Sequence, residues 1–142
     1  MTMSILVQKF GGTSVADGEK IASAANKVLL AKQQGYFPVV VVSAMAGVTN
    51  QLITNALEAK SINDSQSKAE YDALLANGEN ITAALMSLAL QNLGLEARSL
   101  QAWQVPIKTN SNFANSFIEE IPTELLQSLL DKGIIPVIAG FQ

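Results

Sequence analysis

The sequence predicts an α/β fold with a mostly parallel sheet and helices on both faces. Along its 142 residues, short apolar segments of strand length alternate with longer segments that have helical spacing. The run Val39–Val42 is apolar without interruption, which is typical of a strand buried on both faces of a parallel sheet. Gly35, Gly94 and Gly133 each follow a predicted helix, where glycine commonly ends one. Together these patterns favour alternating strands and helices in one domain.

The predicted elements follow from these patterns in chain order. We expect strands at Ser4–Phe10, Val39–Val42, Glu96–Leu100 and Ile134–Ala139. We expect helices from Ser14 to about Gln34, over Val48–Lys60, in a stretch that breaks at Asn77–Gly78, over Glu79–Asn92, and from Pro122 through Leu130. Residues 61–68 are polar and predicted to be a loop, whereas residues 103–117 have no clear pattern and leave room for short strands.

Four local features carry more specific predictions. Ser14 and Asp17 have the spacing of a capping box at the start of the first helix. The helix Glu79–Asn92 is apolar almost all round, so we expect it to be largely buried. Trp103 is assigned to the core, and the pair Glu119–Glu120 to a solvated turn.

Composition excludes several classes of function. The chain has no cysteine and no histidine, so disulfides, thiolate chemistry and Ser-His pairs are excluded and a zinc site is not expected. A net charge of −3 without a basic stretch argues against nucleic acid as a partner. The longest apolar run, around Val39–Val42, is too short to cross a bilayer, and no secretory signal is visible. We therefore expect a cytoplasmic protein with no membrane partner and no metal held by the protein itself.

The junction of the first strand and helix is the first candidate site. Gly11 and Gly12 let the backbone come close to a ligand, and Lys9 adds a positive charge. The backbone amides at the following helix start, including that of Thr13, favour an anion, so the segment suits a polyphosphate. The spacing is neither that of a Walker A loop nor GxGxxG. The alternative is an ordinary strand-to-helix turn beside a solvated lysine.

Two further segments are candidates. The small-residue loop after the second strand contains Ser43 and leads to Thr49 and Asn50, whose simpler interpretation is a helix cap. Glu79 begins an apolar helix, where the helix dipole alone would explain a glutamate. A carboxylate at the tip of a buried helix could equally face a cleft and hold a substrate ammonium.

Taken together, these segments resemble the aspartate kinases of the amino-acid kinase family. The similarity rests on several blocks in a fixed order, and it runs from the first strand to the last residue: Lys9 to Val15, Val41 to Asn50, Gly78-Glu79 with Ala84-Leu85, Ala97 to Ser99 through Trp103-Gln104, and Pro136 to Gln142.

The resemblance implies a three-layer α/β/α sandwich, the amino-acid kinase fold, here incomplete. It implies transfer of the γ-phosphoryl group of ATP, bound with Mg²⁺, to the β-carboxylate of L-aspartate, which gives 4-phospho-L-aspartate, the entry to lysine, threonine and methionine synthesis. It also implies residue roles: phosphate binding by Lys9, Gly11, Gly12 and Thr13, with Lys9 as the catalytic residue, and substrate binding by Ser43, Thr49, Glu79 and Phe141.

The chain departs from the family pattern at two places. The family has a further glycine-rich block, with an arginine and an aspartate, beyond the point where this chain ends. Residues 109–117 also differ, with Asn110 where an aspartate is frequent. We therefore expect residues 1–142 to be the N-terminal part of a catalytic domain, without regulatory ACT domains and without activity on their own.

Two alternatives remain open at this point. Another amino-acid kinase, acting on glutamate, acetylglutamate, carbamate or uridylate, would share the strand-Lys-Gly-Gly arrangement. A non-catalytic assembly module would keep the fold without turnover, and an exposed sheet edge would favour association. A homo-oligomer is the expected state in either case.

Overall fold

The computed structural model describes residues 4–141 and contains a four-stranded parallel sheet in the order β1-β2-β6-β3. Its strands are β1 (Ile5–Phe10), β2 (Phe37–Val42), β6 (Ile135–Ala139) and β3 (Ala97–Leu100). A separate antiparallel ribbon consists of β4 (Lys108–Thr109) and β5 (Ile118–Glu120). The parallel sheet confirms the predicted fold class.

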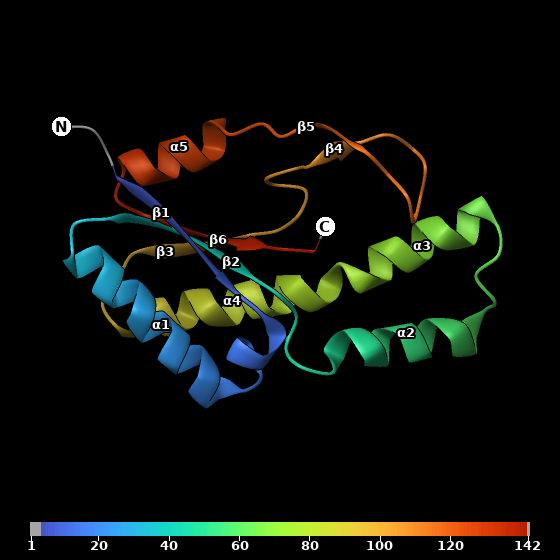
Figure 1. Cartoon of the computed structure of the whole chain (residues 1–142), viewed down its shortest axis with the longest axis horizontal. Helices are drawn as coiled ribbons and strands as arrows, with labels where there is room; N and C mark the ends of the chain where they lie inside the picture. The colour runs from blue at the N-terminus through green and yellow to red at the C-terminus, as the bar shows by residue number, and fades with distance from the viewer. Residues whose placement is uncertain (1–3, 142) are drawn as a thin grey trace.

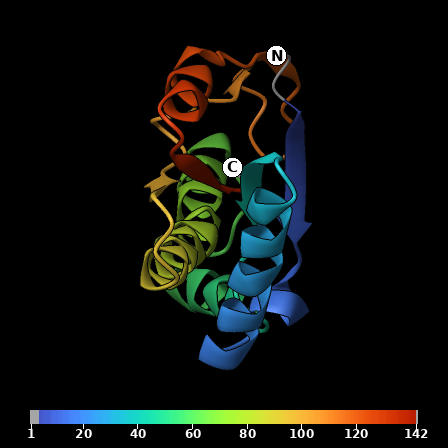
Figure 2. The same ribbon diagram turned by 90° about the vertical axis from the view of Figure 1, so that its left-hand side faces the viewer.

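Helices cover both faces of this sheet. On one face lie α1 (Gly18–Gln33) and α4 (Asn77–Asn92), and on the other lies α5 (Glu124–Asp131). The 3₁₀ turn η1 (Gly12–Val15) precedes α1, while α2 (Val48–Ala59) and α3 (Ser65–Leu75) pack on each other and on α4. Figure 1 shows α1 and α4 below the strands, with α5 and the ribbon above them. Figure 2 shows the same layers from the side, with β1 at the outer edge of the sheet.

Two separate cores hold these layers together. The larger core joins α1 and α4 to one face of the sheet, with Val40, Val42 and Met86 fully buried in it. The smaller core packs α5 on the other face, through Leu100, Leu129 and neighbouring side chains. Because β2 lies between β1 and β6, its apolar side chains contribute to burial on both faces, which explains why the run Val39–Val42 lacks polar residues.

Several helix starts differ from the sequence prediction. The predicted pair of Ser14 with Asp17 is wrong, because η1 ends before α1 begins and Asp17 itself caps α1 by accepting the amide of Lys20 at 2.8 Å. Residues 61–68 are not all loop, since Asp64 forms a capping box with Ser67 and α3 starts at Ser65. The last helix begins at Glu124, two residues beyond Pro122. For α1 and α3 a local side-chain cap decides the start rather than the apolar pattern, whereas α5 has no side-chain cap at Thr123.

Helix α4 is less buried than predicted. Its face toward the sheet is in the core, but Ile81, Leu85 and Leu88 are exposed, so the expectation of burial all round is wrong. The predicted break at Asn77–Gly78 lies one residue earlier, at Ala76, where α3 ends and α4 begins. Ala76 nevertheless keeps helical torsion angles (φ −60°, ψ −20°), so the two helices continue as one stretch. The resulting helical stretch, Ser65–Asn92, is long and apolar enough to cross a membrane by length and composition, which the strand run alone did not suggest. Within the most apolar window of this stretch, 44% is buried inside the protein.

The segment that resisted prediction forms the ribbon and its approach. Trp103 is 72% exposed, so its assignment to the core is wrong. The pair Glu119–Glu120 lies in β5 rather than in a turn, and Glu120 accepts a hydrogen bond from Lys108 Nζ at 2.7 Å. The interaction of Lys108 with Glu120 raises the pKa of this lysine. Short strands in this region, which the sequence left open, are present.

Candidate active site at the carboxyl edge of the sheet

Three strands end side by side at one edge of the sheet. Phe10 at the end of β1 is in register with Val42, and Val42 is in register with Ala139 at the end of β6. The amide of Ser43 donates to the Phe10 carbonyl at 3.0 Å, so the turns after β1 and β2 start from adjacent points. In open α/β sheets ligands bind beyond this edge. The two predicted loops therefore meet where a ligand site is expected.

Three glycines allow the segments around this edge to approach closely. A Cβ atom on Gly12 would lie 2.9 Å from the Ala44 carbonyl oxygen, and one on Gly140 would lie 2.9 Å from the Val42 carbonyl oxygen. A Cβ atom on Gly78 would lie 2.9 Å from the Ala44 Cβ. Real Cβ atoms essentially never come so close to another atom. The loop after β2 is thus enclosed by the turn after β1, the tip of α4 and the end of β6.

A hollow of about 300 Å³ lies between these segments, within the size range of small-molecule sites. It brings together four residues predicted to bind substrate and one predicted to bind phosphate. It is lined by Gly12, Ser43, Ala44, Met45, Ala46, Gly47, Thr49, Glu79 and Phe141.

Glu79 is the acidic residue of this hollow. It is only 3% exposed, and its Oε1 accepts the Ala44 amide at 3.0 Å. Its Oε2 is buried and has no hydrogen-bond partner. A buried acceptor without a partner is costly, so its presence beside a cavity calls for a donor from a ligand. The helix dipole alone does not explain a glutamate that turns inward to bond a distant loop.

Lys9 does not line the hollow. It is the residue before Phe10 at the carboxyl end of β1 and is exposed. Gln8 donates to the Lys27 carbonyl of α1 and Phe10 lies in the larger core, so strand alternation directs Lys9 to the opposite face, the one that α5 covers elsewhere. The lysine and the hollow therefore share one edge of the sheet but approach it from different sides.

The expected anion cradle is also smaller than predicted. The helix directly after the glycines is η1, not α1, and its Ser14 amide already donates to the Gly11 carbonyl at 2.9 Å. The amino terminus of α1 is capped by Asp17. Of the predicted phosphate-binding group, Gly12 lines the hollow, whereas Gly11 and Thr13 are not among its lining residues.

Thr49 is not the cap of α2. The cap position is Gly47, with φ +84°, a left-handed conformation that favours glycine, and α2 starts at Val48. Thr49 lies in the first turn of the helix and faces the hollow. No side chain caps α2 within residues 4–141. The Thr49 hydroxyl therefore does not serve as a helix cap and can contact a ligand.

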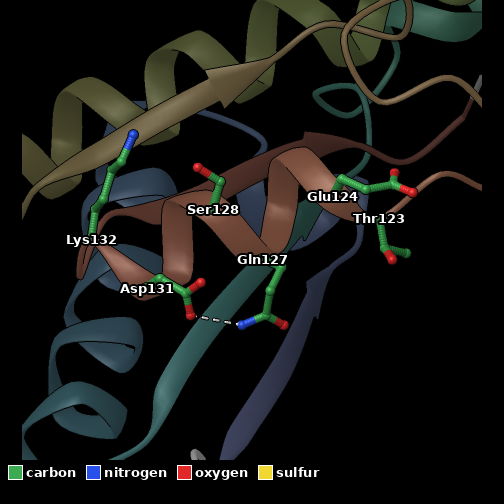
Figure 3. Close-up of a pocket in the computed structure, with 6 residues that line it drawn as sticks. All are labelled: Thr123, Glu124, Gln127, Ser128, Asp131 and Lys132. Atoms are coloured by element: carbon green, nitrogen blue, oxygen red, sulfur yellow. Dashed lines mark hydrogen bonds between the residues drawn. The ribbon is translucent and has the colours of Figure 1, made fainter.

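Other hollows fit a ligand less well. One of about 600 Å³ runs along α5, and Figure 3 shows its polar lining, in which Gln127 donates to Asp131 at 2.9 Å. It contains none of the predicted site residues and no buried polar group without a partner. Within residues 4–141, no group of three or more acidic side chains is placed to hold a metal ion.

Sequence reasoning missed the backbone part of the site. The Ala44 amide, which positions the Glu79 carboxylate, belongs to an alanine with no chemistry of its own. Met45 and Ala46 line the hollow through the same loop. The small residues of the loop after β2 indicated that another segment packs closely on this loop. They did not indicate which segment that is.

A parallel sheet with helices on both faces and a hollow at its carboxyl edge defines an open α/β domain of the kind that binds ligands at this edge. The match to the model of the amino acid kinase family covers residues 4–142. The chain belongs to this family.

The relatives with similar sequences are named aspartokinases. An aspartokinase of Rickettsia prowazekii is 49% identical over 140 residues, which are 99% of this chain and 31% of the relative. An aspartate kinase from Synechocystis has a structure with a TM-score of 0.77 and 40% identity, covering 98% of this chain and 22% of that one. Aspartokinase III of E. coli in complex with aspartate and ADP matches with a TM-score of 0.76 at 23% identity, over 97% of this chain and 40% of that one, which supports the fold. The chain thus spans about a third or less of the first two relatives.

Proposed function

We propose that residues 1–142 form the substrate-binding, N-terminal part of the catalytic domain of an aspartate kinase. The proposed reaction transfers the γ-phosphoryl group of ATP to the β-carboxylate of L-aspartate. The observation that carries the proposal is the buried Glu79 carboxylate, which has one oxygen on the Ala44 amide and the other without a partner beside the hollow. The names of the relatives support aspartate as the substrate.

Glu79 would bind the α-ammonium group of aspartate. An ammonium group supplies donors to the buried Oε2, and a charge-assisted hydrogen bond of this kind is stronger than a neutral one. The hydroxyl groups of Ser43 and Thr49 are further polar groups in the same lining, and the Phe141 ring supplies an apolar wall. The 300 Å³ hollow is large enough for a small amino acid.

Lys9 would act on the phosphoryl group that moves. Phosphoryl transfer depends on positioning and on charge stabilisation more than on covalent chemistry, so neither histidine nor cysteine is needed. The ATP phosphates and the aspartate carboxylate are both anionic, and Lys9 is the cation at the edge where they would meet. Gly11, Gly12 and Thr13 would supply backbone amides to the phosphates, while Mg²⁺ would be carried by the nucleotide.

Glu79→Gln tests the role of Glu79 in binding aspartate. The amide keeps the oxygen that accepts from Ala44 but replaces the unpaired acceptor with a donor that repels an ammonium group. Titration calorimetry on the protein should show L-aspartate affinity falling by about 30-fold or more, as for loss of a charge-assisted pair worth about 2–4 kcal/mol. Succinate, which lacks the ammonium group, should lose little.

Glu19→Gln is the matched control, because Glu19 also lies in the first turn of a helix but is exposed. It should leave aspartate affinity unchanged. The proposal fails if Glu79→Gln binds aspartate as the wild type does, or if aspartate and succinate weaken equally. For the Lys9 role, Lys9→Ala should lower kcat for ADP release, in a protein that includes the whole domain, far more than it lowers aspartate affinity.

Location and assembly complete the proposal. We propose a cytoplasmic enzyme that binds no nucleic acid or membrane and forms a homo-oligomer. Ile5 and Val7 are exposed on the edge strand β1, and burial of these apolar side chains against a second subunit supports the proposed homo-oligomer. Light scattering on the protein measures the oligomeric state directly, and a monomer at all concentrations would contradict this part.

A further inference from the structure

A second hollow adjoins the proposed aspartate site. Its volume is about 500 Å³, and it lies between the β4–β5 ribbon, helix α3 and the end of β6. Phe141 lines both hollows, so the two hollows are adjacent. The ribbon contributes Thr109, Phe113, Ala114, Ser116 and Ile118, α3 contributes Asp72, and the remaining lining comes from Ile107, Gly140 and Phe141.

Hydrogen bonds within the tip of this ribbon fix its local shape. Asn110 Oδ1 accepts from the amides of Asn112 and Phe117, at 3.2 and 3.3 Å. Ser116 Oγ donates to the Asn112 carbonyl at 3.0 Å, and the Asn115 amide donates to the same residue at 2.9 Å. These bonds make residues 110–117 a compact unit, but all of them are local to the tip. They do not determine where the tip lies on the protein.

One hydrogen bond joins the tip to the body of the protein. The Ala114 amide donates to Asp72 Oδ2 at 3.0 Å, across 42 positions in sequence, and Figure 1 shows the β4–β5 loop descending to α3. Ala114 has φ +68°, a left-handed conformation that is unfavourable for alanine and turns its amide toward α3. A strained residue held by one carboxylate marks a point where the surrounding structure determines the backbone.

We propose that Asp72 is a positioning residue that holds the ribbon tip next to Phe141, so that the tip forms the outer wall of the proposed aspartate site. This inference rests on the proposed function, and it adds the ribbon tip to the residues that enclose the proposed aspartate site. Asp72 is in α3 and Glu79 is in α4, seven positions on, and Ala76 continues the helix between them. The wall and the ammonium-binding carboxylate are thus placed by one helical stretch.

Hydrogen exchange tests the positioning by Asp72. In the variant Asp72→Ala, amides of residues 110–117 should exchange about three- to tenfold faster, the effect of losing one hydrogen bond to a carboxylate. Amides in the sheet and in α4 should keep their wild-type rates. Asp72→Asn retains an oxygen acceptor and should lie between the two. Asp131→Ala is the control, since Asp131 is another helical aspartate that accepts one side-chain bond, far from the tip.

Aspartate affinity separates a wall of the site from a purely structural contact. Asp72→Ala should weaken L-aspartate binding about three- to tenfold without changing the thermal midpoint of the protein by more than about 2 °C. Unchanged exchange in residues 110–117, or faster exchange with unchanged aspartate affinity, would overturn the inference. If the wild type binds no aspartate, the proposed function fails, and the wall role of the ribbon fails with it, whereas positioning of the tip by Asp72 is still decided by exchange alone.

Discussion

Replacing Gly78 by alanine should destabilise the protein, although alanine is the better helix former. Gly78 is the second residue of α4, and the new Cβ would lie 2.9 Å from the Ala44 Cβ and 3.4 Å from Val48 Cγ1. The first of these neighbours is the methyl group of the buried loop residue Ala44, which has no other rotamer that would move it away. The helix tip or the loop has to move.

The magnitude follows from two opposing terms. Alanine in place of glycine in a helix stabilises by about 0.5–1 kcal/mol. Forcing an extra methyl group into a packed site costs about 1–3 kcal/mol. The net expectation is a loss of about 1 kcal/mol in the free energy of unfolding, or a drop of about 0.5 M in the urea midpoint. Because Ala44 would shift, its amide would also move from the Glu79 carboxylate.

Urea unfolding followed by circular dichroism measures the change. Gly18→Ala is the matched control, since Gly18 starts α1 and a Cβ there meets nothing within 4 Å, and it should stabilise by about 0.5 kcal/mol. Ala44→Gly in the Gly78→Ala background restores the space and should recover part of the loss. A Gly78→Ala protein as stable as Gly18→Ala would refute the close packing of helix tip against loop.

Two further predictions concern α4 and α3. Met86→Ala should cost about 2–5 kcal/mol in urea unfolding because Met86 is fully buried, whereas Leu88→Ala, at a 61% exposed position on the same helix, should cost less than about 0.5 kcal/mol. Equal losses would contradict the burial of only one face of α4. The pKa of Asp64 is lowered from 3.8 to about 2 because its carboxylate accepts the Ser67 amide and pairs with Lys60. The contribution of the ionised carboxylate to stability should therefore be present above pH 3.8 and be lost as the pH falls through about 2. Asp64→Ala should lower the urea midpoint clearly at pH 5 and much less at pH 2.

The strand over Val39–Val42 could be predicted, together with its burial, because it is a short and uninterrupted apolar run. Val39–Val42 lies between two neighbours and under two helix layers, and its composition reports that environment directly. Helix starts were less predictable, since the capping residue of α1 is Asp17 and that of α2 is Gly47. A cap is one residue chosen among several polar or small ones, and sequence pattern alone does not distinguish them. Residues 103–117 showed no clear sequence pattern, because β4 and the adjoining β5 are only two and three residues long and give too few positions for a period to appear.

Four of the predicted site residues lie together in the structure, but the arrangement around them was not predictable from the sequence. Ser43, Thr49, Glu79 and Phe141 line one hollow, as the convergence of strand ends at one edge implies. Lys9 was expected in the same space, but strand alternation directs it to the other face, a consequence of register that a motif does not encode. The ordering of Glu79 by a backbone amide also has no sequence signature, because every residue type except proline carries such an amide.

The helical torsions of Ala76 make residues 65–92 a single rod of 28 residues, about 40 Å long. The α4 half of this rod is packed against the sheet, whereas the α3 half extends beyond the sheet (Figure 1). A rotation of this rod by a few degrees about its packed half would displace Ser65, at the far end of α3, by about one to two ångströms. Because both ends belong to one helical stretch, a rotation of this stretch about the sheet would displace the end near Ser65 further than the residues beside Glu79.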